Sequence, residues 1–170
     1  SGYMVSEAKP ITLNKNTSVT VANTPEALTI VKKDAVNGDV LPGATFTLLD
    51  SAGNPVAITS AGDGSYTVSN NGSTTFTTGS DGKAIIRQLP KASYTLREAT
   101  MDGYNTLADV AVSFTGANVV TIENQPTVLE FTKTDSVTCE ALDGGTFRIS
   151  DSNGTAMLLA KLEDGVYRKS

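Results

Sequence analysis

The sequence of 170 residues contains no histidine, no tryptophan and a single cysteine. Without histidine, the chain cannot build the Ser–His or Cys–His pairs that activate a nucleophile, nor most zinc sites. One cysteine cannot close an internal disulfide, and we interpret Cys139 as an exposed thiol in a turn. These absences argue against an enzyme that turns over a substrate, and we expect neither a metal nor another cofactor.

Charge and hydropathy exclude two further classes of partner. Lysine and arginine number 13 against 18 aspartate and glutamate residues, which gives a net charge of −5 without any basic cluster. A surface of this kind does not attract nucleic acid or an anionic membrane. No apolar run approaches the roughly 20 residues of a membrane span, so we expect no membrane insertion in this segment.

One long pattern occurs twice in the chain, at an offset of 101 residues. Leu28–Asp50 reads LTIVKKDAVNGDVLPGATFTLLD, and Leu129–Asp151 reads LEFTKTDSVTCEALDGGTFRISD. A fixed long period indicates tandem copies of one domain. The sequence therefore predicts the C-terminal part of a preceding repeat over residues 1–25, a complete repeat over residues 26–126, and the N-terminal part of a following repeat over residues 127–170.

Short stretches rich in Val, Thr and Ile alternate with Asn-Gly and Asp-Gly turn signals throughout the complete repeat. Many short strands at this spacing predict an all-β fold, an antiparallel β-sandwich. Two further strands are expected within residues 1–25. Half a sandwich has unpaired edges and an open core, so the partial repeats are not expected to be ordered alone. The strands expected in the complete repeat cover residues 28–33, 44–50, 64–69, 73–78, 83–88, 92–99, 106–114 and 117–124.

Three of these strands carry an apolar face that ends in a polar residue. Because alternate side chains of a strand share a face, Lys32, Glu98 and Asn124 each continue a row of apolar side chains. An amine, a carboxyl and a carboxamide are thus expected inside the sandwich. The first partial repeat keeps the carboxamide as Asn23, and the last keeps the amine as Lys133.

Burial constrains the chemistry of these three groups. It favours neutral forms, so it lowers the pKa of Lys32 and raises the pKa of Glu98. A neutral amine is a nucleophile, and a protonated carboxyl can polarise the carboxamide of Asn124, so that attack and loss of ammonia would leave a Lys–Asn amide. The alternative is a buried Lys32–Glu98 ion pair capped by a hydrogen bond from Asn124. Periodicity alone favours this alternative, because satisfied buried pairs are commoner than self-modifying ones.

The segments that carry the three residues resemble the B-type (Cna B-like) repeat domain of collagen-binding adhesins, which also occurs in Gram-positive pilins. The similar segments are LTIVKKD…GDVLPGATFTLLD around Lys32, LPKASYTLREATMDGY around Glu98, and VVTIENQP around Asn124. The resemblance implies a prealbumin-like, inverse-immunoglobulin sandwich with an autocatalytic isopeptide bond between Lys32 and Asn124, for which Glu98 is the catalytic acid. The family's usual proline before GY is absent from residues 99–103, which we expect to alter a loop and not the site.

The resulting hypothesis is a structural one. The repeat would belong to the stalk of an adhesin or pilin that is anchored to the cell wall of a Gram-positive bacterium, outside the cell, with neighbouring repeats as its partners. The chemistry of Glu98 would then be a single self-modification. The alternative is an adhesive binding module whose loops contact a host matrix protein or glycan, although no exposed aromatic cluster in the sequence favours it.

Overall fold

The computed structural model describes residues 8, 10–12, 14–16, 18–21, 26–62 and 64–170. Every regular element in these residues is a β-strand, so the predicted all-β class is confirmed. The same residues contain no helix of the length and apolarity that a membrane crossing requires. The strands are β1 (Ala27–Asp34), β2 (Thr45–Leu49), β3 (Ile58–Ser60), β4 (Ser65–Val68), β5 (Phe76–Thr77), β6 (Lys83–Arg87), β7 (Ala92–Glu98), β8 (Val110–Phe114), β9 (Ala117–Asn124), β10 (Val128–Glu130), β11 (Leu159–Glu163) and β12 (Val166–Lys169).

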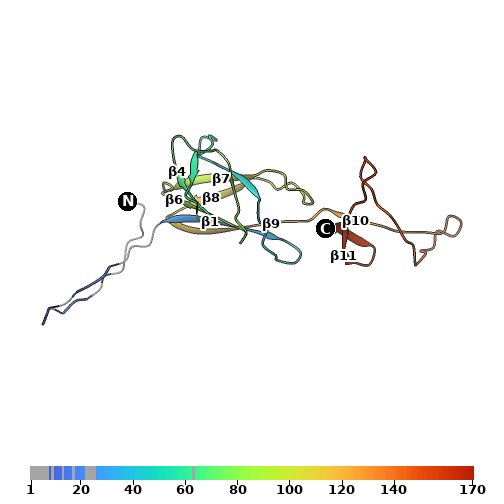
Figure 1. Ribbon diagram of the computed structural model, residues 1–170, viewed down its shortest axis with the longest axis horizontal. Helices are drawn as coiled ribbons and strands as arrows, with labels where there is room; N and C mark the ends of the chain where they lie inside the picture. The colour runs from blue at the N-terminus through green and yellow to red at the C-terminus, as the bar shows by residue number, and fades with distance from the viewer. Residues whose placement is uncertain (1–7, 9, 13, 17, 22–25, 63) are drawn as a thin grey trace.

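Residues 27–124 form a sandwich of two sheets (Figure 1). One sheet has the strand order β3-β4-β6-β1-β9, and the other has the order β5-β2-β7-β8. A third, separate sheet with the order β10-β12-β11 lies in residues 128–169. The sandwich and the third sheet lie one after the other along the longest axis of the molecule.

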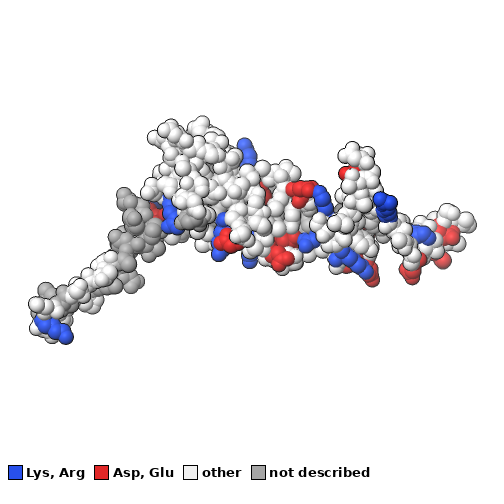
Figure 2. Space-filling model, in the orientation of Figure 1, with Lys and Arg blue, Asp and Glu red and all other residues white. Residues whose placement is uncertain are grey.

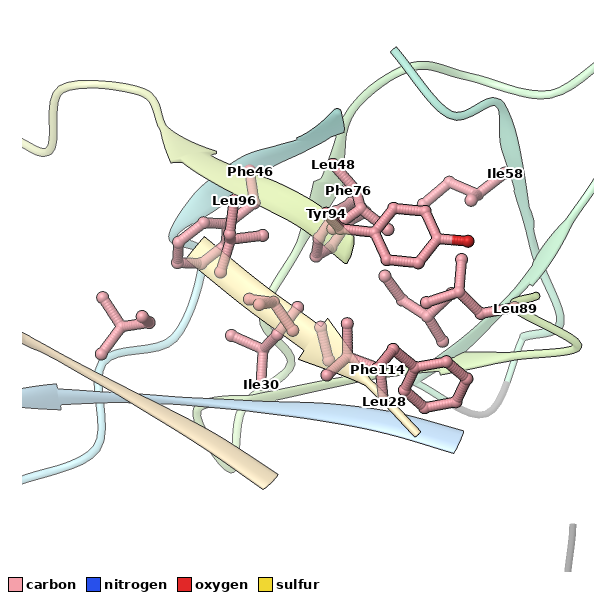
Figure 3. Close-up of a cluster of buried hydrophobic side chains, with 14 of the residues drawn as sticks. Leu28, Ile30, Phe46, Leu48, Ile58, Phe76, Leu89, Tyr94, Leu96 and Phe114 are labelled. Carbon is pink, nitrogen blue, oxygen red and sulfur yellow. The ribbon is translucent and has the colours of Figure 1, made fainter. Parts of the chain in front are cut away.

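The core of the sandwich follows from the alternation of side chains along the strands. In β1, every second residue from Leu28 onward is buried, and the residues between them are partly exposed. Side chains from both sheets meet between the layers, as Figure 3 shows. The rings of Phe46 on β2 and Phe76 on β5 stack at 5.8 Å between centroids. The buried apolar surface of the two sheets thus holds the layers together.

The first and last strands of the sandwich are neighbours and run parallel. β1 pairs with β9 along its whole length, with Lys32 opposite Ile122 and Asp34 opposite Asn124. β4 and β6 also pair in parallel, whereas the other pairings in the sandwich are antiparallel. Because β1 and β9 point the same way, the chain enters the sandwich at one end and leaves it at the other.

Three strands differ from the sequence prediction, one in its presence and two in their length. β3 was not expected, and it forms because Ile58 is buried and pairs with Val68 of β4. β5 and β8 are shorter than the predicted 73–78 and 106–114, since only part of each range finds a partner strand. The two strands predicted within residues 1–25 are absent from the described residues of that range, and the other residues of the range lie outside the described part of the chain.

Residues 127–170 form an incomplete layer. Phe131 stacks on Phe147 at 5.2 Å and meets Tyr167 edge-on at 5.9 Å, yet Phe147 stays 54% exposed. Of the matching residues of the sandwich, 101 positions earlier, Ile30 and Phe46 are buried in its core, and Tyr66 packs against that core partly buried. Cys139 has a positive φ of 60°, as does its counterpart Gly38 with 75°, which agrees with the predicted turn. This segment therefore resembles the first part of the sandwich without the facing strands.

Candidate functional site

Three strands bring the predicted site residues together inside the sandwich. Lys32 lies on β1 and Asn124 on β9, in the same sheet. Paired residues of parallel strands point to the same side, and Asn124 lies two residues beyond the partner of Lys32, so both side chains face inward, one pleat apart. Glu98 lies at the end of β7 in the opposite sheet, paired with Phe46. The amine, carboxyl and carboxamide therefore converge from both layers.

Glu98 makes one hydrogen bond and one longer ionic contact with the other two side chains. The Asn124 Nδ2 atom donates a hydrogen bond of 3.1 Å to Glu98 Oε1. Lys32 Nζ lies 3.8 Å from the same oxygen, which is an ionic distance but too long for a hydrogen bond. The side chains of Lys32 and Glu98 are 0% and 2% exposed, and Asn124 is 2% exposed. The site is therefore closed to bulk water.

Burial shifts the proton equilibria of both charged groups toward their neutral forms. The pKa of Lys32 is lowered from its ordinary value, because desolvation of the ammonium outweighs the attraction of the Glu98 carboxylate. The pKa of Glu98 is raised, because desolvation outweighs the opposing effects of Lys32 and of the hydrogen bond from Asn124. Both shifts move the pair toward a neutral amine facing a protonated carboxyl.

Each of the three side chains also keeps one buried polar atom without a hydrogen-bond partner: Lys32 Nζ, Glu98 Oε2 and Asn124 Oδ1. Such atoms are rare in folded proteins because an unsatisfied buried group costs about 1–3 kcal/mol. A stable structural ion pair would satisfy them. In this arrangement, instead, Lys32 Nζ donates no hydrogen bond, and Asn124 Oδ1 accepts none and could accept one from a protonated carboxyl.

Of the two residues predicted in the partial repeats, the one that the structure describes, Lys133, has no such surroundings. Lys133 is exposed and lines an open cleft of about 890 Å³ together with Phe131, Phe147 and Tyr167. Asn23 lies outside the described residues. In the part of the chain that the structure describes, no group of three or more His, Cys, Asp or Glu side chains could hold a metal ion.

Two residues beside the site were not singled out from the sequence. Asp34, two positions after Lys32, is 1% exposed and accepts a hydrogen bond of 2.9 Å from the hydroxyl of Tyr104. The recurrence of Asp34 as Asp135, and of the Gly-Tyr pair that contains Tyr104, could have drawn attention to both. Periodicity alone gave no reason to connect two residues 70 positions apart.

Lys32, Glu98 and Asn124 thus form a buried polar cluster between the two sheets of the sandwich. The comparison with protein families assigns the same residues to a prealbumin-like fold. Residues 26–126 match the SpaA prealbumin-like fold domain family, and the chain belongs to that family. The resemblance to the Cna B-like domains of Gram-positive surface proteins is thereby confirmed at the level of the family and fold. No curated protein sequence matches the chain.

Solved structures similar to the chain are pilins. GBS52, the minor pilin of the Gram-positive pathogen Streptococcus agalactiae, is 25% identical with a TM-score of 0.52, over 67% of this chain and 51% of that one. The shaft pilin spaA of Lactobacillus rhamnosus GG is 25% identical with a TM-score of 0.50, over 62% of this chain and 50% of that one. The match thus spans about half of each pilin. For the separate C-terminal domain of that shaft pilin, it spans 98% of the domain and 60% of this chain, with 25% identity and a TM-score of 0.51.

Proposed function

We propose that residues 26–126 form a stalk domain of a Gram-positive surface pilin or adhesin, locked by an isopeptide bond between Lys32 and Asn124. The observation that carries the proposal is the convergence of three buried side chains, each with one unsatisfied polar atom, on a site where burial favours a neutral lysine. The pilin relatives support the stalk role, and the cross-link would supply its resistance to force and proteolysis.

The bond would form by acyl transfer to the lysine. The neutral Nζ of Lys32 attacks the side-chain carbonyl carbon of Asn124, forming a C–N bond. The carbonyl C–NH₂ bond then breaks, and one proton moves from the lysine nitrogen to the leaving group, which departs as ammonia. The products are one secondary amide and one ammonia molecule, so no outside reactant is required.

Glu98 would serve as the acid and proton shuttle of this reaction. Its Oε1 already accepts from Asn124 Nδ2. A proton on Oε2 would make that atom a donor for Asn124 Oδ1, and the acid and carboxamide would then form a cyclic pair that satisfies both unpaired oxygens. Such a hydrogen bond withdraws electron density from the carbonyl carbon and stabilises the negative charge that develops on its oxygen. The closed site excludes water as a competing nucleophile.

The decisive experiment is the intact mass of the 170-residue chain under denaturing conditions. We expect a mass lower than the calculated value by one ammonia molecule. The Lys32→Ala, Glu98→Ala and Asn124→Ala variants are each expected to show their full calculated masses. Lys133→Ala is the matched control, because Lys133 is exposed, and the deficit should persist in it. A full calculated mass for the unsubstituted chain would sink the proposal and leave a buried ion pair.

The extracellular, wall-anchored location and the partnership with neighbouring repeats belong to the same proposal. They are supported by the pilin relatives and by the 101-residue offset within the sequence. A binding role toward host matrix protein or glycan stays a prediction without an observation that favours it. Binding of the purified chain to immobilised collagen or fibronectin would support that role.

A further inference from the structure

The C-terminal end of β1 holds a buried carboxylate whose counter-ion comes from a distant part of the chain. Asp34 Oδ1 accepts hydrogen bonds from the amides of Val36 at 2.8 Å and Asn37 at 3.2 Å. Asp34 Oδ2 accepts from the Tyr104 hydroxyl and, at 2.5 Å, from the guanidinium of Arg168. Arg168 lies on β12, in the segment that follows the sandwich. One carboxylate thus joins the sandwich to its neighbour.

A second ion pair and the connecting backbone lie beside this contact. Lys169, the next residue of β12, forms an ion pair with Asp102 of the sandwich. The Thr127 amide donates to the Gly103 carbonyl at 2.9 Å, which ties the connection to the loop before Tyr104. A cavity of about 300 Å³ lies among these residues. Figure 2 shows acidic and basic side chains next to one another where the sandwich meets the following segment.

The buried acid at the opposite end of β1 has its ion-pair partner within the sandwich. Glu26, immediately before β1, is 8% exposed at its side chain and pairs with Lys91 of the same sandwich at 2.7 Å. Asp34 is more deeply buried, and in the described part of the chain its ion-pair partner is Arg168. A buried charge without a counter-ion is strongly destabilising. The sandwich therefore neutralises one end of β1 by itself and depends on another segment at the other end.

We propose that the carboxylates of Asp34 and Asp102, the first of them held by the Tyr104 hydroxyl, form an acceptor face that docks a neighbouring segment of the same chain through an Arg–Lys pair on its central strand, β12. The buried Asp34–Arg168 pair fixes the orientation of that segment, because the guanidinium must meet a carboxylate whose two oxygens are already held by three other donors. The exposed Asp102–Lys169 pair adds little of its own. The acceptor face thus makes the joint after the sandwich a rigid one.

The docking is specific for the order of the segments. Arg168 and Lys169 correspond, 101 positions earlier, to Thr67 and Val68 on β4 of the sandwich. Those side chains carry no charge, so residues 26–126 cannot offer the same pair to a segment that precedes them. The acceptor face therefore selects a following segment with basic residues at these two positions. The face adjoins the Lys32–Asn124 site, because Asp34 lies opposite Asn124 in the strand register, but its ion pairs with Arg168 and Lys169 do not use the cross-linking side chains.

Spin labels on the full chain test the joint. One label is attached to Cys139, the sole native cysteine, which is exposed in the following segment, and the other to an introduced Ser51→Cys in an exposed turn of the sandwich. Electron–electron distance measurements are expected to give one narrow distribution. Arg168→Gln should broaden it and shift the docking equilibrium toward the undocked state by roughly ten- to a hundredfold, the effect of losing a hydrogen bond to a charged group. Lys169→Gln, the matched control, should keep the narrow distribution.

A double substitution separates electrostatic docking from general damage. Asp34→Asn is expected to broaden the distribution as Arg168→Gln does, and combining the two should add no further broadening. A narrow distribution in Arg168→Gln, or a broad one in the unsubstituted chain, would overturn the proposal. The intact mass of the same samples reports the cross-link separately, so a full mass with a narrow distance would remove the isopeptide bond and leave the joint standing.

Discussion

A lysine ammonium normally stays in water, yet Lys32 has no exposed surface and its Nζ has no hydrogen-bond partner. The sequence predicted this burial because Lys32 continues the apolar face of its strand, and the same reasoning located Glu98 and Asn124. What periodicity could not supply was the state of the three groups. The 3.8 Å gap between Lys32 Nζ and Glu98 Oε1 and the three unpaired atoms are properties of packing between two sheets.

Removing the lysine is expected to make stability depend on pH through Glu98. In Lys32→Met, no cross-link can form and Glu98 stays buried without its cation. The pKa of Glu98 is raised above its ordinary value of 4.5, so the folded state binds more protons than the unfolded state between 4.5 and the raised value. Stability is therefore fully present below 4.5 and falls as pH rises through that window, by about 1.4 kcal/mol per unit of pKa difference. Urea denaturation across that range measures the effect.

The control for this prediction is the double variant Lys32→Met/Glu98→Gln. Glutamine has nearly the shape of glutamate but does not titrate, so the fall in stability should disappear. Stability of Lys32→Met that rises with pH through the same window would contradict the raised pKa of Glu98.

At the scale of the strands, the sequence located most elements but not their pairing. Turn signals and alternation gave the positions of β1, β2, β4, β6, β7 and β9 within a few residues. The parallel pairing of β1 with β9 was not predicted, because it joins segments about 90 residues apart and no local pattern encodes such a contact. The contact of Arg168 with Asp34 escaped for the same reason. The domain limits, the repeat organisation and the roles of the site residues stay predictions.

One turn is expected to control the position of Lys32 on β1. Gly82, before β6, has a φ of +68°, and a Cβ atom there would lie 2.9 Å from the Lys32 carbonyl oxygen and 2.7 Å from the Val40 Cβ. Gly82→Ala should displace the backbone at Lys32 and destabilise the sandwich by roughly 2–4 kcal/mol, from a strained φ together with overpacking. We expect a lower urea midpoint and a fraction of chains that retain the full mass.

Gly53→Ala is the matched variant for this prediction. Gly53 also has a positive φ, of +83°, but an added Cβ would meet nothing within 4 Å. Only the backbone strain of about 1–2 kcal/mol should appear, and the cross-link should form completely. Equal effects of the two substitutions would show that contact with the Lys32 backbone is unimportant.

At the scale of the whole sandwich, the parallel pair β1–β9 decides how tension would pass through it. Force applied at Ala27 and Asn124 pulls two neighbouring strands in opposite directions, so their shared ladder is loaded in shear. With the proposed bond in place, tension would pass from β1 through the Lys32 side chain to Asn124. The residues between them would carry none of it.

Single-molecule pulling is expected to separate the locked and unlocked forms. The unsubstituted chain should show no extension from the sandwich, whereas Glu98→Ala should release a loop of about 90 residues, roughly 300 Å at full extension. The same variant should lose about 4–5 kcal/mol of stability, because the closed loop no longer restricts the unfolded chain, which corresponds to roughly 20–30 °C in melting temperature. A 300 Å extension in the unsubstituted chain would contradict the covalent lock.

The direction of β1 and β9 also fixes how much length a chain of such units gains for the residues it uses. Eight-residue strands that start at one end and finish at the other advance the chain by about 25 Å. The same 101 residues, fully extended, would reach more than about 300 Å. An array of such units would therefore span less than one-tenth of the length of its fully extended chain. Its length would be set by the number of units and not by the applied force.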